Sequence, residues 1–272
     1  MTDRLVLVTG GSGYIGTVLV PLLAKTYPVR VYESMLFGNA IADTPNCEFI
    51  QGDIRDEATV RKALDGVTDV IHLAAIVTDA LVDLNPKMGR EVNNQAVRGL
   101  CYAASCAGVK RLIYASSSSV YGTQPDICTE DSLVLPMTEY ARQKFQGECI
   151  VNSFQGYMTV VSVRSATACG PAPRMRADTI VNTFSGQAYF NGEITVHGGD
   201  QYRTNIHVAD IADLYAFLLD APADRINGQV FNATRANHTA LELAEMVQGI
   251  MGGKITVNRD MLDDRHYRMD GN

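Results

Sequence analysis

Continuously apolar runs alternate with amphipathic segments along the first two thirds of the chain. The apolar runs predict β-strands at residues 4–9, 29–33, 47–50, 69–73, 111–116 and 159–164. Apolar residues at helical spacing between them predict helices at residues 14–25, 56–65, 86–107 and 138–155. Strands that are apolar along their whole length and are separated by helices are typical of a doubly wound parallel sheet in the α/β class.

This alternation becomes less regular after residue 166. The pattern there predicts a helix at 179–188, returns to the sheet at 205–208 and 229–232, a helix at 240–251 and a short strand at 254–257.

The chain of 272 residues is 46% hydrophobic and has nine prolines, which favours one compact unit with a small appendage. We predict a sheet-forming domain at residues 1–166, rejoined by about 204–235. The smaller C-terminal part then comprises residues 167–203 and 236–272.

Charge and cysteine usage narrow the class of partner and the compartment. The net charge of −7 disfavours nucleic acid and anionic membrane surfaces as partners and favours a small-molecule ligand. The sequence has no secretory leader pattern and no run of apolar residues long enough to span a membrane, so we expect a cytoplasmic protein. Six cysteines without C-x-x-C spacing indicate reduced thiols, and neither they nor the five scattered histidines predict a metal site.

A glycine-rich turn follows the first predicted strand and precedes the first predicted helix, with the sequence Gly10-Gly11-Ser12-Gly13-Tyr14-Ile15-Gly16. The amino terminus of such a helix presents unpaired N–H groups and the positive end of the helix dipole. A pyrophosphate can therefore bind at residues 13–16, including Tyr14 and Ile15, without a basic side chain. The turn predicts a dinucleotide site.

Glu33 ends the second predicted strand, about twenty residues after the turn, where an acid meets the adenosine ribose hydroxyls. Its carboxylate would repel a 2′-phosphate, so the cofactor predicted is NAD rather than NADP. A solvated carboxylate at a strand end is the alternative for Glu33.

Tyr140 and Lys144 lie four residues apart and share one face of a predicted helix. An ammonium beside a phenol lowers the pKa of the phenol, so Tyr140 is predicted to act as a base and Lys144 also to hold the nicotinamide ribose. The predicted strand at 111–116 ends beside the same cleft in a run of four serines, one of which can hydrogen-bond a reacting sugar oxygen. The pattern alone does not choose among these serines, and a surface Tyr/Lys pair is the alternative.

These motifs together resemble the extended short-chain dehydrogenase/reductases of the nucleotide-sugar epimerase and dehydratase family, over essentially the whole chain. The resemblance implies a Rossmann fold and assigns cofactor contacts to Gly10, Gly13, Gly16, Glu33, Asp53, Ile54, Leu73, Ala74, Ala75 and Asn93. It places the Y-x-x-x-K pair at Tyr140 and Lys144. Family members carry a hydroxyl residue four places before the Tyr of a Val-Tyr-Gly segment, which here selects Ser117.

The same resemblance implies a substrate site for a nucleotide-diphosphate sugar. Arg203, ahead of a His-Val-x-Asp segment, would grip the diphosphate, and Thr167 stands where many epimerases have Asn. Thr78 is a further predicted substrate contact. From the residues alone, the Arg174/Arg176 pair could bind a phosphate or a uronic carboxylate through charge-assisted hydrogen bonds, and exposed arginines without a ligand are the alternative. Family members continue past Arg268 into a closing segment, so we expect the C-terminal pocket to be truncated here. The resemblance also implies a homodimer through the helices predicted at 86–107 and 138–155.

The expected reaction is NAD-dependent epimerisation of the sugar, by transient oxidation at C4 and return of the hydride. Dehydratases of this family place Asp-Glu directly after the hydroxyl residue, and this chain has Ser118 and Ser119 there. The alternatives are an NAD(P)H-dependent reductase of a 4-keto-deoxysugar nucleotide, a nucleotide-sugar dehydratase and a non-catalytic dinucleotide-binding protein.

Overall fold

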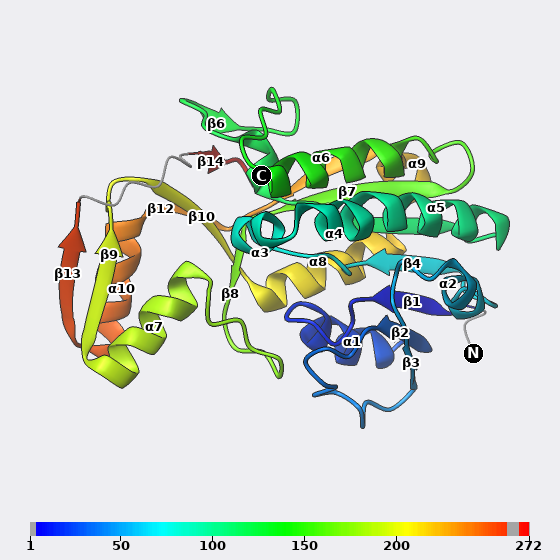
Figure 1. Cartoon of the computed structure of the whole chain (residues 1–272), viewed down its shortest axis with the longest axis horizontal. Coiled ribbons are helices and arrows are strands. Elements are labelled where there is room, and N and C mark those ends of the chain that lie inside the picture. The colour runs from blue at the N-terminus through cyan, green and yellow to red at the C-terminus, as the bar shows by residue number, and fades with distance from the viewer. Residues whose placement is uncertain (1–3, 260–266, 272) are drawn as a thin grey trace.

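A computed structural model describes residues 4–259 and 267–271 and places a seven-stranded parallel sheet at the centre of the protein (Figure 1). The strand order is β3-β2-β1-β4-β5-β7-β11, and every neighbouring pair is parallel. The strands are β1 (Val6–Thr9), β2 (Val29–Glu33), β3 (Cys47–Gln51), β4 (Asp69–His72), β5 (Arg111–Ala115), β7 (Thr159–Ser165) and β11 (Gln229–Ala233). This order confirms the predicted doubly wound fold.

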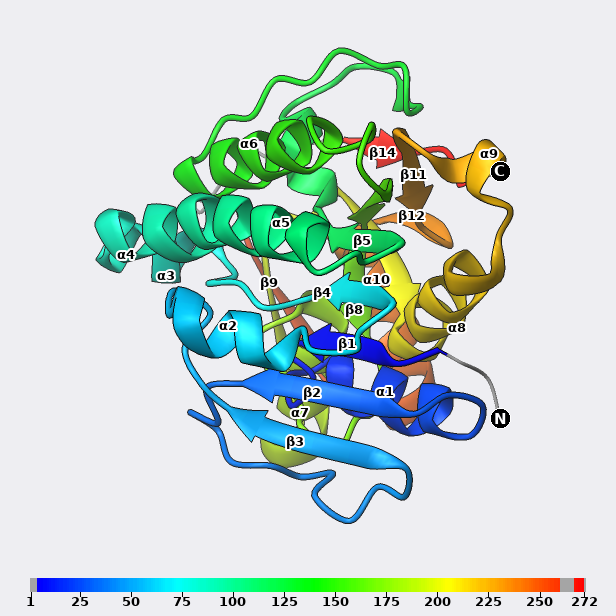
Figure 2. The same ribbon diagram turned by 90° about the vertical axis from the view of Figure 1, so that its right-hand side faces the viewer.

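Helices cover both faces of the sheet because the strands are apolar on both sides. In β1, Val6 and Val8 pack toward α1 (Gly16–Ala24) and α8 (Val208–Asp220). Leu7, between them, packs on the opposite face with α2 (Glu57–Ala63), α5 (Ala96–Cys106) and α6 (Glu139–Asn152). Figure 2 shows the strands from β3 at the lower edge through β1 to β5, with α5 level with β5 and α6 above it.

The helix predicted at 86–107 is a continuous run of three segments, two α-helical and one π-helical. It consists of α4 (Pro86–Arg90), a π-helical turn η1 (Glu91–Gln95) and α5. The short α3 (Asp79–Leu84) precedes this run, and a 3-10 turn η2 (Ser118–Tyr121) follows β5. The pattern predicted neither α3 nor α8.

The C-terminal part forms smaller sheets beside the main one, at the left in Figure 1. A three-stranded sheet contains β8 (Thr167–Cys169), β10 (Tyr202–His207) and β12 (Ala236–Thr239). Two parallel pairs accompany it, β9 (Glu193–His197) with β13 (Lys254–Asn258) and β6 (Ile127–Cys128) with β14 (Arg268–Met269). Apolar residues of α7 (Ile180–Asn191) and α10 (Ala240–Met251) form a separate core with β9.

One predicted strand joins a different sheet from the one expected. The segment predicted to return to the central sheet at 205–208 belongs to β10, which pairs with β8 and β12 instead. The chain returns to the central sheet at β11, after α8 and the short α9 (Ala223–Ile226). Strand pairing is decided by contacts that are distant in sequence, so an apolar run does not reveal which sheet it joins.

Residues 260–266, within the predicted C-terminal part, lie outside the described residues. In the part of the chain that the structure describes, no helix is long and apolar enough to cross a membrane.

Candidate active site

The glycine turn lies directly against the end of β4. Gly10 has φ +73°, and a Cβ there would lie 2.6 Å from the backbone nitrogen of Ala74, a second predicted cofactor residue. A Cβ at Gly16 would lie 2.4 Å from the carbonyl oxygen of Gly11. Glycine is therefore required at both positions for the turn to close on the strand ends.

At the start of α1, the backbone N–H groups of Thr17 and Val18 donate to the Gly13 and Ile15 carbonyls, whereas those of Tyr14, Ile15 and Gly16 donate to no described residue. Ile15 is the N-cap residue and has no side-chain capping bond to the described residues, and no acidic residue lies in the first turn. A helix that begins in this way binds a pyrophosphate with backbone groups and the helix dipole. The turn therefore fits the diphosphate of a dinucleotide.

Glu33 ends β2 with its carboxylate folded over the following residues. Its Oε1 accepts hydrogen bonds from the Ser34 N–H at 2.7 Å, the Ser34 hydroxyl at 2.9 Å and the Met35 N–H at 3.4 Å. The other oxygen of this carboxylate, Oε2, accepts no hydrogen bond from the described residues. It is therefore left for ribose hydroxyls. The position and the chemistry fit the predicted role.

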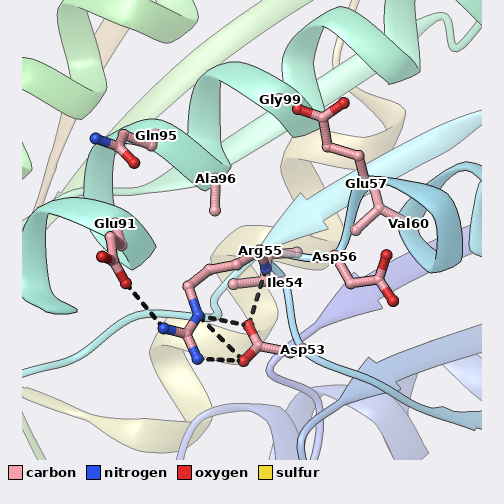
Figure 3. Close-up of a pocket in the computed structure, with 10 residues that line it drawn as sticks. All are labelled: Asp53, Ile54, Arg55, Asp56, Glu57, Val60, Glu91, Gln95, Ala96 and Gly99. Atoms are coloured by element: carbon pink, nitrogen blue, oxygen red, sulfur yellow. Dashed lines mark hydrogen bonds and ion pairs between the residues drawn. The ribbon is translucent and has the colours of Figure 1, made fainter.

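Asp53 and Ile54 line a cavity of about 500 Å³ between α2 and the start of α5 (Figure 3). The Asp53 carboxylate accepts hydrogen bonds from Arg55 at 2.6 Å from Nη2 and 2.9 Å from the backbone N–H, which lower the pKa of Asp53. Arg55 also reaches Glu91 at 2.9 Å. An adenine amino group would share the Asp53 carboxylate with Arg55, so Asp53 and Ile54 remain predicted contacts.

Asn93 is buried in the π-helical turn and fixes the backbone that follows β4. Its Oδ1 accepts from the Ile76 N–H at 2.9 Å, and its Nδ2 donates to the Ile76 carbonyl at 2.9 Å and to Gln143 Oε1 at 2.9 Å. It therefore ties the predicted cofactor-lining segment, Leu73 to Ala75, to the helix that carries Tyr140.

The structure brings Ser117 and Tyr140 together from two distant segments, near enough for the Ser117 hydroxyl to lower the pKa of the phenol. Ser117 follows β5 as the N-cap of η2, where its Oγ accepts from the Ser119 N–H at 3.2 Å and the Ser119 hydroxyl at 2.9 Å. Tyr140 lies in the first turn of α6, which Thr138 caps by accepting from the Ala141 N–H at 3.1 Å. Of the serine run, Ser117 therefore meets the phenol.

Lys144 lies one turn after Tyr140 and is 3% exposed. Its Nζ lies 4.5 Å from the centre of the Tyr114 ring, a cation–π geometry. Burial lowers the pKa of Lys144 to about 8, against the nearby Glu148 carboxylate, which raises it.

The prediction that Lys144 lowers the pKa of Tyr140 is wrong for the protein chain by itself. Burial raises the pKa of Tyr140 to about 12, although the nearby Ser117 hydroxyl and the charge of Arg176 act in the opposite direction. Loss of water around the phenol favours its neutral form, and here this effect exceeds the two influences that lower the pKa. Tyr140 is therefore a neutral phenol at pH 7 before a ligand contributes charge.

A buried ion pair joins α6 to β7 of the central sheet. The sequence pattern did not predict this pair. Arg164 on β7 donates to Glu148 through Nε at 3.0 Å and Nη2 at 2.9 Å, and both side chains are about 5% exposed. The Ser116 hydroxyl donates to the same carboxylate. The arginine's hydrogen bonds and opposite charge compensate the burial of the carboxylate.

The predicted substrate residues lie on several different elements, and of these residues Arg176 is the one whose charge acts on Tyr140. Thr167 on β8 and Arg203 on β10 are on adjacent strands, since Thr167 pairs with Asn205. Thr78 has φ +81° and caps α3 by accepting from the Leu81 N–H at 3.3 Å, and a β-branched residue with positive φ is strained backbone of the kind found at functional sites.

Tyr267 is a site neighbour that the sequence did not single out. The pairing of β14 with β6 brings this segment to the site, where the Tyr267 and Ser118 hydroxyls lie 2.9 Å apart. Its nearness to Tyr140 also raises the pKa of that phenol.

Residues 6–234 match the family described as the NAD dependent epimerase/dehydratase family. The chain belongs to this family. It is 30% identical to dTDP-D-glucose 4,6-dehydratase of Mus musculus, over 89% of this chain and 72% of the mouse protein. It is 28% identical to UDP-glucose 4-epimerase of Lactobacillus helveticus, over 91% of this chain and 82% of that enzyme.

Solved structures agree with these relatives. MoeE5 in complex with UDP-glucuronic acid and NAD has a TM-score of 0.87 and 26% identity, over 98% of this chain and 89% of MoeE5. A UDP-N-acetylglucosamine 4-epimerase from Methanobrevibacter ruminantium has a TM-score of 0.86 and 28% identity, over 100% and 90%. The predicted family, Rossmann fold and NAD cofactor are thereby confirmed, and the site residues stay predictions.

Proposed function

We propose that this protein is an NAD-dependent epimerase that inverts C4 of a nucleotide-diphosphate sugar. The observation that carries the proposal is the nearness of the Ser117 hydroxyl to the Tyr140 phenol, with the buried Lys144 one turn away on the same helix. A phenol and an alcohol that meet at the carboxyl ends of the strands can hold one sugar hydroxyl between them.

Each residue of the set has a chemical role at that hydroxyl. Ser117 orients the sugar oxygen, and the Tyr140 Oη accepts its proton and later returns it. When bound, NAD supplies the hydride acceptor and donor at C4 and a positive charge that favours the phenolate. Lys144 and Glu33 would hold its two riboses, and the turn at residues 10–16 its diphosphate.

Dehydration is disfavoured by the residues that follow Ser117. Loss of a hydroxide needs an acid and a base near C6, and the positions that carry Asp-Glu in the family's dehydratases hold Ser118 and Ser119 here. Both serine hydroxyls lie in hydrogen bonds, Ser118 with Tyr267 and Ser119 with Ser117. No carboxylate therefore follows Ser117 in the site, although relatives include dehydratases.

Two arginines point to an anionic substrate. Arg203 is proposed to contact the diphosphate, and Arg176 to meet a phosphate or a sugar carboxylate close to Tyr140. MoeE5 has been solved with UDP-glucuronic acid, which makes a uronic acid nucleotide a useful member of any substrate panel. We also propose a homodimer formed through α5 and α6.

The test is turnover of UDP-, dTDP-, GDP- and CDP-hexoses and UDP-uronic acids by the purified protein, followed by chromatography and mass spectrometry. An epimerase returns an isomer of unchanged mass with no net consumption of NADH. A product lighter by one water identifies a dehydratase, and stoichiometric loss of NADH with a 4-ketosugar nucleotide identifies a reductase. Absence of any inverted sugar would overturn the proposal.

A further inference from the structure

The loop at residues 170–178, between β8 and α7, carries Arg176. It lies against the glycine-rich turn at residues 10–16, the predicted pyrophosphate site (the cofactor turn). We propose that Asn182 and Tyr14 act as positioning residues that fix this loop to the cofactor turn, so that binding of NAD orders the loop that meets the sugar. The inference rests on the proposed function for the role of Arg176, but its test does not.

Asn182 holds both ends of the 170–178 loop with one buried side chain, 8% exposed. Its Oδ1 accepts from the Gly170 N–H at 3.0 Å, and its Nδ2 donates to the Arg176 carbonyl at 2.8 Å. An amide has two donors and an acceptor in a fixed geometry, which a hydrophobic residue of the same size lacks. The separation of the loop ends is thus set by one residue of α7.

Tyr14 connects this arrangement to the glycine turn. Its hydroxyl donates to the Gly170 carbonyl at 2.5 Å and accepts from Asn182 Nδ2 at 3.1 Å. The Tyr14 side chain is 5% exposed, and its backbone belongs to the turn predicted to bind the pyrophosphate. A movement of the turn therefore displaces Gly170 and Asn182 with it.

Two further contacts join the 170–178 loop to α1 and to the segment that follows β2. The Arg174 N–H donates to Thr17 Oγ1 on α1 at 3.3 Å, and the Arg174 guanidinium lies 4.1 Å from the centre of the Phe37 ring, beyond the end of β2. Each contact joins the loop to an element that flanks the predicted cofactor site.

An ion pair within the loop fixes the orientation of the Arg176 guanidinium. Arg176 donates to Asp178 through Nη2 at 2.7 Å and Nε at 3.0 Å, and its charge acts on both Tyr140 and Tyr14. Because Asn182 fixes the backbone of Arg176, the position of this guanidinium relative to the reacting phenol depends on the Asn182 amide. Asn182 would thus influence substrate affinity without touching the cofactor.

The experiment measures hydrogen exchange of peptides covering residues 170–178, with and without NAD, in the wild-type chain, Tyr14→Phe and Asn182→Asp. Asn182→Asp keeps the acceptor for Gly170 and removes both donors, and Tyr14→Phe removes one hydroxyl. We expect NAD to slow exchange in this loop at least about five-fold in the wild type and less than about two-fold in both variants. Thr183→Val is the matched control, because it removes a neighbouring bond to the loop, Thr183 Oγ1 to the Ala177 carbonyl at 2.7 Å, and leaves the Tyr14–Asn182 network intact.

A difference caused by NAD separates positioning from stability, since a merely structural role would change exchange equally in both states. Equal NAD-dependent protection in wild type and both variants overturns the inference, and so does a wild type that binds NAD without protecting the loop. The proposed function is judged separately by turnover of the sugar panel, so either can fail alone. If Tyr14→Phe alone loses the protection, Asn182 is removed from the proposal and Tyr14 retained.

Discussion

The cofactor turn and the 170–178 loop lie against each other, but they are held in different ways. The turn is fixed by the absence of side chains, since a Cβ at Gly10 or Gly16 would overlap backbone atoms. The loop is fixed by side chains that come from elsewhere, Asn182 from α7 and Tyr14 from the turn. The first kind of constraint is local in sequence and tolerates no substitution, whereas the second is distributed and can be weakened one bond at a time.

We expect the largest effect at Tyr140, where the proposed reaction takes place. Tyr140→Phe removes the proposed proton acceptor, and we expect kcat for the proposed sugar inversion to fall about 10³-fold, within the range for loss of a general base. Retention of NAD by the purified variant should be unchanged, since only one hydroxyl is lost. Tyr189→Phe, on an exposed tyrosine of α7, is the control. A kcat within ten-fold of wild type would remove Tyr140 from the mechanism.

The turn is broken most directly at Gly10. Gly10→Ala requires an unfavourable positive φ and places a Cβ 2.6 Å from the Ala74 nitrogen, so we expect a loss of about 3 kcal/mol in the free energy of unfolding. Gly66→Ala is matched, because Gly66 has φ +71° and no described heavy atom within 4 Å of its Cβ position. We expect about 1 kcal/mol there. Urea denaturation compares the two, and equal losses would refute the close approach.

The cost of burying Lys144 can be tested through the pH dependence of the free energy of unfolding. Its pKa is lowered to about 8 from 10.5, so the unfolded chain binds this proton more tightly and the cost of burying the ammonium is full below pH 8. Without NAD, Lys144→Met should therefore raise the free energy of unfolding by about 2–3 kcal/mol at pH 7. The gain should shrink as the pH rises from 8 to 10.5.

Urea denaturation at several pH values measures that gain. Lys62→Met, on an exposed lysine of α2, is the control. A gain from Lys144→Met that is constant with pH would contradict the lowered pKa.

The smallest effect concerns the contact of Arg174 with Phe37. Phe37→Ala removes a cation–π interaction on an exposed ring, so we expect loss of about 0.5–1 kcal/mol, seen as a two- to five-fold higher dissociation constant for NAD. Calorimetric titration measures it, with Leu36→Ala as the exposed neighbouring control. Identical affinities for both variants and wild type would show that this contact does not help to hold the cofactor.

Constraints that are local in sequence could be predicted from the chain. Gly10 to Gly16, the alternating faces of β1 and the spacing of Tyr140 and Lys144 depend on residues a few positions apart, so their patterns indicate strand, turn and helix face. The inner parallel strands β1, β4, β5 and β7 follow from apolar runs that are buried on both sides. The family resemblance selected Ser117 from four adjacent serines, and the structure brings that residue to Tyr140.

The remaining features depend on pairs that are distant in sequence. Arg164 and Glu148 partner across a strand and a helix, and Tyr14 reaches Asn182 from 168 positions away. Polar residues of this kind carry no periodic signal, because a buried hydrogen bond requires only that both partners arrive. The pKa of Tyr140 was predicted in the wrong direction because spacing shows which groups are neighbours and does not show how much water they lose.

The π-helical turn at Glu91–Gln95 makes this part of the protein sensitive to chain length. A turn of this kind contains one residue more than an α-helix would use over the same rise. Removing a single residue between 91 and 95 would restore regular winding and rotate the preceding turns by about 100° relative to α5. A one-residue deletion here would thus break the two hydrogen bonds between Asn93 and the Ile76 backbone. The candidate site residues would all remain in the sequence, but they would no longer be aligned.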